Sequence, residues 1–205
     1  MQRLVVGVSG ASGIILAHHL IKYVCDKGFM VDLVMTPQAL YTARYELCED
    51  ISTAKRFIAT FAPSIQQNIH LHGIHDVGSH IASGSHLTYG MVVIPCSMAT
   101  VAAIAVGLGD NCLRRAADVT LKEKRPLVLV PREAPLSELH LENLHKLARL
   151  GATIVPPLPA WYTRPQTIQD IEFFIVGKVL DALKIEHNLY PRWKAEDTAK
   201  ELACH

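Results

Sequence analysis

The chain has 205 residues, half of them hydrophobic and 19% charged, which suits one globular domain with a sizeable core. Lysine and arginine number 20 against 19 aspartate and glutamate residues, so no global electric field favours a nucleic acid or an anionic membrane as partner. Five cysteines without a Cys-x-x-Cys spacing argue against a disulfide framework or a structural zinc site.

Short apolar runs predict the strands of a buried parallel sheet. The first run, Leu4–Val8, is broken by glycine and serine too early to form a signal-peptide core. No later run is long enough to span a bilayer, so we expect a cytoplasmic protein. The other predicted strands are Val31–Met35, Met91–Ile94, Leu127–Val130 and Thr153–Val155.

Segments with helical spacing alternate with these strands. The clearest are Ile14–Lys27, which Gly28 ends, Ser137–Leu150, and Thr167–Leu183 with Asp170 three residues after its first threonine. The last is apolar on more than one face, which indicates a subunit interface. The alternation predicts an α/β fold: a doubly wound parallel sheet in three layers, flavodoxin-like or Rossmann-like. We expect one domain over residues 1–192 and a polar tail over residues 193–205.

A glycine-rich turn, Gly7–Gly13, follows the first strand. Its glycines allow backbone N–H groups to approach a phosphate at the N-terminus of the next helix. The glycine spacing differs from the dinucleotide fingerprint, and the acidic residue about 20 positions on, Asp32, lies in mid-strand, so a mononucleotide phosphate is the better candidate. A tight turn that binds nothing remains the alternative.

Polar or turn-forming residues follow the other predicted strands at the same edge of the sheet, where doubly wound folds bind ligands. Ser97 and Thr100 would lie at a helix start, where their hydroxyls cap the helix or bind a ligand. Cys96 has no obvious histidine partner, so we do not expect it to act as a nucleophile. The other residues at this rim are Thr36, Arg132, Glu133, Trp161 and Tyr162.

The segment 111–123 reads as a helix with two cations on one face. Arg115 and Lys122 lie two turns apart, an arrangement suited to a phosphate. A solvated surface with an ion pair between Arg115 and Asp118 is an equally good interpretation.

Periodicity fades over residues 63–89, which we expect to include loops near a ligand or a neighbouring subunit. His70, His72 and His75 lie here, but only Asp76 stands near them as a further ligand. We therefore predict a histidine-rich loop and no metal.

Several long motifs, in order and spacing, resemble the UbiX-type flavin prenyltransferases, and the resemblance reaches Trp193. They are Gly10–Gly13, Pro95–Thr100, Arg115–Glu123, Pro126–Pro135 and Pro159–Tyr162. The resemblance implies a flavodoxin-like fold that binds FMN, in a homododecamer whose active sites lie at subunit junctions. It also implies transfer of the dimethylallyl group of dimethylallyl monophosphate to reduced FMN at N5 and C6, without a metal, and delivery of the prenylated FMN to a UbiD-type decarboxylase.

The same resemblance assigns roles to particular residues. It implies FMN contacts from Gly10, Ala11, Ser12, Thr36, Ser97, Met98, Ala99, Thr100 and Arg132. It implies contacts with the prenyl phosphate from Arg115, Lys122, Arg132, Glu133, Tyr162 and Lys178. Ser12 and Glu133 would relay protons, Glu46 would be a further acidic group near the flavin, and Trp193 would offer a π face to the allylic cation. Two positions depart from the family pattern: Thr36 is often serine there, and Lys178 is often arginine.

Two other functions fit parts of the sequence. A flavin-dependent cysteine decarboxylase would share the fold, but Pro95–Thr100 differs from the Pro-Ala-Ser-Ala-Asn-Thr pattern of that group. A non-catalytic flavoprotein would need the glycine turn and Ser97, but not the basic residues expected to meet at Glu133.

Overall fold

The computed structural model describes residues 2–47 and 50–193. One parallel sheet of six strands, in the order β3-β2-β1-β4-β5-β6, forms its centre. The predicted doubly wound fold is confirmed, and its strand order is that of the Rossmann arrangement. The strands are β1 (Arg3–Val8), β2 (Met30–Met35), β3 (Ile69–His72), β4 (Gly90–Cys96), β5 (Leu127–Pro131) and β6 (Thr153–Ile154).

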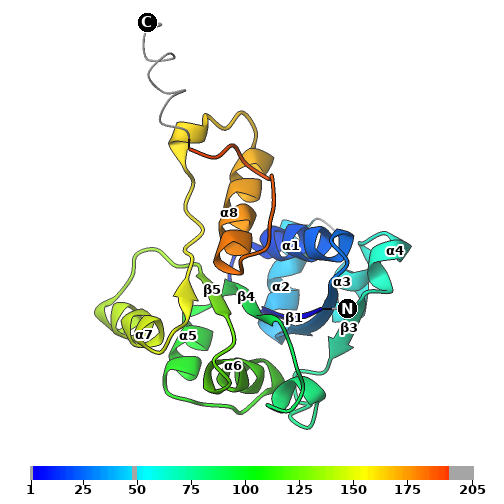
Figure 1. Ribbon diagram of the computed structural model, residues 1–205, viewed down its shortest axis with the longest axis vertical. Coiled ribbons are helices and arrows are strands. Elements are labelled where there is room, and N and C mark those ends of the chain that lie inside the picture. Colours follow the sequence, from blue (N-terminus) through cyan, green and yellow to red (C-terminus); the bar gives the residue numbers. More distant parts are fainter. Residues whose placement is uncertain (1, 48–49, 194–205) are drawn as a thin grey trace, which may run out of the picture.

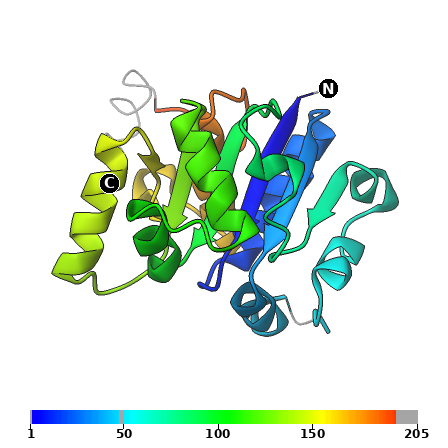
Figure 2. The same ribbon diagram turned by 90° about the horizontal axis from the view of Figure 1, so that it is seen from below.

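Helices cover both faces of this sheet (Figure 1). One face packs against α1 (Ile14–Asp26), α2 (Pro37–Glu46), α3 (Ala54–Ala59), the short α4 (Pro63–Gln66) and α8 (Ile168–Ala182). The other face packs against α5 (Met98–Ala105), α6 (Cys112–Lys122), α7 (Glu138–Arg149) and the 3₁₀ helix η1 (His80–Ala82). Figure 2 views the molecule from this second side, with α6 in front of the strands.

Alternation along the strands divides the core in two. In β1, Leu4 and Val6 point toward α1 and α8, whereas Val5 points toward α5 and α6. Both layers are apolar, so the strands read as continuous hydrophobic runs, as the sequence indicated. The predicted helix starts at Ser137 and Thr167 are confirmed, and each residue accepts a hydrogen bond from the backbone N–H three positions on.

Residues 63–89 include loops, as expected, but His70 and His72 lie on a strand and not in a loop. This segment contains α4, the edge strand β3 and η1. Strand β3 pairs only with β2 and carries histidines at alternate positions, which weakened its hydrophobic signal. Asp32 lies in mid-strand as expected, and its buried carboxylate is held by Arg3 and His72.

The topology leaves a crevice at one edge of the sheet. The chain passes from β1 to β2 on one side, and β4 pairs with β1 on the other. Loops after β1 and β4 therefore diverge above their carboxyl ends, which is where such sheets bind ligands. Of the predicted tail, only Trp193 belongs to the described residues, so the domain boundary at residue 192 stays a prediction. No helix in residues 2–47 or 50–193 has the length and apolar character needed to cross a membrane.

Candidate active site

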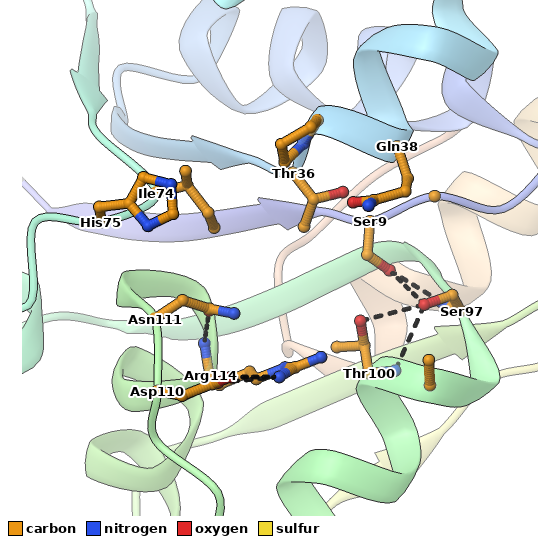
Figure 3. A pocket seen from close by; sticks show the side chains of 13 residues that line it. Ser9, Thr36, Gln38, Ile74, His75, Ser97, Thr100, Asp110, Asn111 and Arg114 are labelled. Carbon is orange, nitrogen blue, oxygen red and sulfur yellow. Dashed lines mark hydrogen bonds and ion pairs between the residues drawn. The ribbon is translucent and has the colours of Figure 1, made fainter.

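A cavity of about 500 Å³ occupies this crevice (Figure 3). Its size lies in the range of small-molecule and cofactor sites. The loops after β1, β2 and β4 form one side, and the segment that leads into α6 forms the other. The lining residues are Ser9, Gly10, Thr36, Pro37, Gln38, Ile74, His75, Ser97, Ala99, Thr100, Asp110, Asn111 and Arg114.

The turn after β1 is packed closely against the start of α2. A Cβ atom at Gly10 would lie 2.3 Å from the Cβ of Gln38, so the wall has no room for a side chain there. Gly13 adopts a φ of 111°, a left-handed conformation that favours glycine. These two glycines allow the chain to pass from β1 to α1 beside the cavity.

The N-terminus of α1 already has an acidic partner. Both carboxylate oxygens of Glu46 accept hydrogen bonds from the N–H of Gly13, at 2.9 and 3.1 Å, and one also accepts from Ile14 at 2.7 Å. The sequence analysis expected these N–H groups to face a phosphate. The carboxylate instead meets the positive end of the helix dipole, and Glu46 holds the glycine turn in place.

Hydroxyl groups form the floor of the cavity. Ser9 accepts a hydrogen bond from the N–H of Ser97 at 2.8 Å and donates to the carbonyl of Pro95 at 3.2 Å, which joins the ends of β1 and β4. Ser97 caps α5 through the N–H of Thr100, and their two hydroxyls lie 3.0 Å apart. Thr36 caps α2 in the same way. The capping residues thus also line the cavity, so a capping role does not exclude a contact with a ligand.

Sequence reasoning missed Ser9 and Arg114. Ser9 was inside the glycine-rich turn, but its burial next to Ser97 depends on the pairing of β1 with β4. Arg114 lines the cavity at the first turn of α6, where its guanidinium pairs with Asp110 at 2.8 Å. The spacing argument selected Arg115, whose guanidinium instead pairs with Asp118 at 2.6 Å.

Lys122 lies far from the cavity of its own chain. It ends α6, whose 11 residues make a helix about 16 Å long. Its ammonium pairs with Glu123 and lies near Gly84, at the edge of the sheet where β4 and β5 begin. Within its own subunit, Lys122 therefore lies at the opposite edge of the sheet from Arg132 and Glu133.

Arg132 and Glu133 follow β5 at the same edge as the cavity and are exposed. The N–H of Arg132 donates to the carbonyl of Cys96, so the loop after β5 lies next to the loop after β4. Ser12 is exposed on the turn, Ala11 is half-buried, and Met98 packs in the core. Within the described chain, none of these five is among the residues that line the cavity.

Tyr162 belongs to the segment between β6 and α8, which projects from the sheet (Figure 1), whereas Lys178 lies on α8, which packs against the sheet. The segment after β6 contains the 3₁₀ helix η2 (Trp161–Thr163), and the rings of Tyr162 and Trp193 meet edge to face with centroids 4.9 Å apart. Nζ of Lys178 lies 3.6 Å from Oδ2 of Asp181, with which it forms an ion pair. Both aromatic rings are largely exposed.

Cys96 is fully buried, and desolvation raises the pKa of its thiol far above the ordinary value. It therefore stays protonated at neutral pH, which agrees with the expectation that it is no nucleophile. Its sulfur lies 3.7 Å from the carbonyl of Ser97.

A doubly wound sheet with a hydroxyl-lined cavity at its switch point defines a mononucleotide-binding α/β protein, and the chain matches the Flavoprotein family over residues 1–180. Flavin prenyltransferase UbiX of Chlamydia trachomatis is 50% identical over 95% of this chain and 98% of its own. Flavin prenyltransferase LpdB of Lactiplantibacillus plantarum is 47% identical over 96% of this chain and 100% of its own. The chain belongs to the UbiX-type flavin prenyltransferases.

Solved structures agree with this assignment. AnUbiX (PadA1) in complex with FMN and dimethylallyl pyrophosphate has a TM-score of 0.84 and 37% identity, covering 95% of this chain and 98% of its own. A dodecameric FMN-dependent Ubix-like decarboxylase from Escherichia coli O157:H7 has a TM-score of 0.84 and 40% identity, covering 95% and 100%. The peptidyl-cysteine decarboxylase EpiD reaches a TM-score of 0.57 at 18% identity, a likeness that shows the fold alone.

Proposed function

We propose that the protein binds reduced FMN and transfers to it the dimethylallyl group of dimethylallyl monophosphate. The allylic C–O bond breaks and phosphate leaves with the electron pair. The bond at flavin N5 forms with loss of the N5 proton. For the bond at C6, the double bond of the transferred prenyl group takes up one proton and C6 loses one, so the flavin gains C5H8 in total. The observation that carries this proposal is the likeness to AnUbiX, whose structure contains FMN and dimethylallyl pyrophosphate.

The cavity has the donors that a flavin mononucleotide requires. The hydroxyls of Ser9, Thr36, Ser97 and Thr100 can hydrogen-bond the ribityl chain and the ring edge. The phosphate would lie near the guanidinium of Arg114 and the first turn of α6, because a cation and a helix N-terminus coincide there. The flavin phosphate would then lie away from the N-terminus of α1, where Glu46 accepts the backbone hydrogen bonds.

The prenyl phosphate requires residues from more than one subunit. Negative charge grows on the leaving phosphate, and clustered cations stabilise that charge. Arg132 lies at the rim of the cavity, but Lys122 lies at the opposite edge of the sheet. We therefore propose that Arg115, Lys122, Tyr162 and Lys178 reach the site of a neighbouring subunit.

A homododecamer provides such junctions and is the assembly of the Escherichia coli relative. Large hydrophobic side chains are exposed on α7, in the segment between β6 and α8, at the start of α8 and at the end of the described chain. Their exposure favours burial between subunits. They include Leu139, Leu141, Leu158, Trp161, Tyr162, Ile168 and Trp193.

Protons would pass through groups at the rim. Glu133 accepts a hydrogen bond from the N–H of Ala134, and its exposed carboxylate can take the proton lost at C6 or donate one to the phosphate. Ser12 would assist from the turn. Trp193 would stabilise the allylic cation, as a π face does for a cation.

Anaerobic incubation with reduced FMN tests the proposal. With dimethylallyl monophosphate, the flavin should gain the mass of one C5H8 unit, and dimethylallyl diphosphate in a parallel reaction determines the preferred donor. An unchanged flavin mass with both donors would exclude prenyl transfer and favour a non-catalytic flavoprotein. Glu133→Gln should bind FMN as wild type does but lose turnover by about 10²–10⁴-fold.

The product would pass to a UbiD-type decarboxylase. Filtrate from the completed reaction should activate such a decarboxylase that was purified without its cofactor. Filtrate from a reaction without the prenyl donor is the control. Equal activity with both filtrates would contradict this assignment of the recipient.

A further inference from the structure

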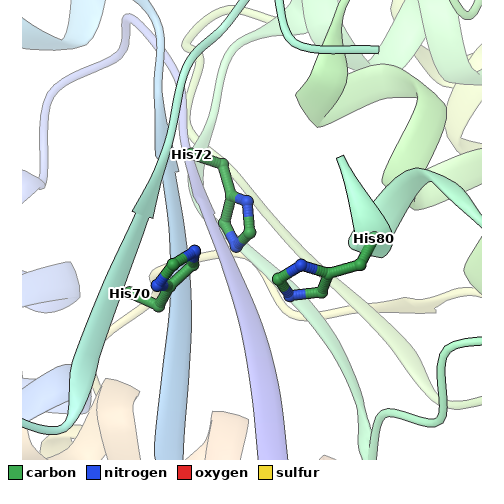
Figure 4. A group of neighbouring side chains, drawn as sticks. All are labelled: His70, His72 and His80. Atoms are coloured by element: carbon green, nitrogen blue, oxygen red, sulfur yellow. The ribbon is translucent and has the colours of Figure 1, made fainter. Parts of the chain in front are cut away.

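A group of histidines lies beside the edge strand β3, apart from the proposed prenyl-transfer site. His70 and His72 alternate along β3 and so share one face of the sheet, and His80 reaches the same place from η1. Figure 4 shows the three imidazole rings grouped together, with their residues contributed by two separate backbone segments. His75, which the sequence analysis grouped with His70 and His72, lines the main cavity instead.

The distances suit a shared metal ion. One ring nitrogen from each of His70, His72 and His80 lies within 4.8 Å of the others. The ring centroid of His72 lies 4.6 Å from that of His70 and 4.7 Å from that of His80. Asp32 is within reach, since its Oδ1 is 2.9 Å from Nε2 of His72 and 3.4 Å from Nε2 of His80. His86 forms a second such group with Asp32 and His80.

We propose that His70, His72 and His80 bind one divalent transition-metal ion, with the carboxylate of Asp32 beside them. Imidazole nitrogens favour Zn²⁺, Co²⁺, Ni²⁺ and Cu²⁺ over Mg²⁺ or Ca²⁺. Tetrahedral bonds of 2.0–2.1 Å separate ligand atoms by about 3.3–3.4 Å. The three nitrogens, which lie within 4.8 Å of one another, would move closer to that spacing when the ion binds.

Hydrogen bonds orient the buried imidazole of the group. Oγ of Ser79 lies 2.6 Å from Nδ1 of His72 and fixes the orientation of that ring, as partners of metal-binding histidines do. The Arg3 guanidinium balances the charge of Asp32.

The site is open to solvent, and a bound ion would have a structural role. His70 and His80 are exposed, so an ion can enter without opening the core. A bound ion would join β3 to the segment that carries η1. That segment is also held by Arg125, which donates to the carbonyls of Gly84 and His86. The ion would stabilise this edge of the sheet and take no part in prenyl transfer.

The test uses the untagged full-length protein after treatment with a chelator. Titration with Co²⁺ should give intense visible absorption bands that saturate at one equivalent per chain, and Zn²⁺ should abolish them. His70→Ala and His80→Ala should each weaken Co²⁺ binding at least tenfold. His145→Ala, an exposed histidine on α7, is the matched control and should bind as wild type does.

Thermal unfolding gives a second measurement. Zn²⁺ at about a hundredfold excess over its Kd should raise the Tm of wild type by roughly 5–10 °C and leave His80→Ala unchanged. All variants should melt like wild type in the presence of chelator, which verifies that they fold. Absence of the bands, or binding by His70→Ala and His80→Ala equal to that of His145→Ala, would overturn the proposal. Prenyl transfer should persist in chelator, so the two proposals fail independently.

Discussion

The N–H of Gly13 donates hydrogen bonds to both carboxylate oxygens of Glu46, at 2.9 Å to Oε1 and 3.1 Å to Oε2. This contact joins the last residue of α2 to the turn before α1. It places a protein carboxylate where glycine turns of doubly wound folds commonly hold phosphate. The turn is thereby fixed as a wall of the cavity, and the N–H groups of Gly13 and Ile14 already have an acceptor within the chain.

Replacing Glu46 should therefore loosen the turn. Glu46→Ala removes an acceptor from two N–H groups at a helix N-terminus, which should cost about 0.5–2 kcal/mol of unfolding free energy. FMN affinity should also fall, because the wall formed by Gly10 moves. Urea unfolding and FMN titration measure both effects. Glu142→Ala, an exposed change on α7, is the control, and equal stability of the two variants would contradict the role of Glu46.

A methyl group at position 10 should distort the wall of the cavity. In Gly10→Ala the new Cβ would lie 2.3 Å from the Cβ of Gln38, so α2 or the turn has to shift at a cost of about 1–3 kcal/mol. FMN binding should weaken at least tenfold in a fluorescence titration. Gly78→Ala is the matched control, since its Cβ would meet only Asp76, at 3.6 Å. Unchanged FMN affinity in Gly10→Ala would show that this wall does not contact the ligand.

The centre of the sheet could be predicted because β1, β2, β4 and β5 are apolar runs that need both faces buried. Strand β3 could not, because it lies at the edge and alternates Ile69 and Leu71 with histidines. Its histidines face a polar cluster that only the folded chain creates, through Asp32 on β2 and His80 on η1.

The site was predictable where one motif carries several contacts. Ser97, Ala99 and Thr100 lie together after β4 because a helix begins there. Arg114 was not predictable, because helical spacing says which residues share a face but not which face meets the cavity. The family resemblance assigned Lys122 to the prenyl phosphate, but the sequence did not indicate that it would end α6 at the opposite edge of the sheet from the cavity.

Asp181, near the end of α8, should make the stability of the fold sensitive to acid. Burial alone would raise its pKa, but hydrogen bonds from Tyr190, Arg192 and His187 outweigh this and lower the pKa to about 2. Because the unfolded pKa is higher, about 4, these contacts stabilise the fold above pH 4 and are lost as the pH falls through the folded pKa. Between about pH 4 and pH 2 wild type should lose roughly 1–2 kcal/mol that Asp181→Asn does not.

Urea unfolding over a pH series measures this difference. The control is the exposed ion pair between Lys22 and Asp26. Asp26→Asn should follow the wild-type profile, since an exposed ion pair contributes little. Parallel profiles for wild type and Asp181→Asn would contradict the role of Asp181. Trp193 fluorescence should report the same transition, since that residue directly follows Arg192.

Three cysteines should resist alkylation in the folded protein. Burial raises the pKa of Cys25 to about 12 and that of Cys112 to about 11, and in both cases a nearby aspartate adds to the effect. Cys96 is buried completely. Thiolate is the reactive form, so iodoacetamide at pH 8 should leave these residues unmodified, as peptide mass spectrometry would show. Unfolding in urea is the control that should expose all three, and rapid native alkylation of Cys96 would contradict its burial.

Arg114 and Arg115 are adjacent, yet they should affect different ligands. Arg114 lines the cavity of its own chain, whereas Arg115 points to Asp118 on the outer surface of α6. If Arg114 holds the flavin phosphate, Arg114→Ala should weaken FMN binding by about 10–100-fold, the value of a charge-assisted hydrogen bond. Arg115→Ala should leave the FMN Kd unchanged and raise the KM for dimethylallyl monophosphate, because it would serve the neighbouring subunit. FMN titration and initial rates separate the two effects, and size-exclusion chromatography verifies that both variants assemble. If Arg115→Ala weakens FMN binding while Arg114→Ala does not, the assignment of the two arginines is reversed.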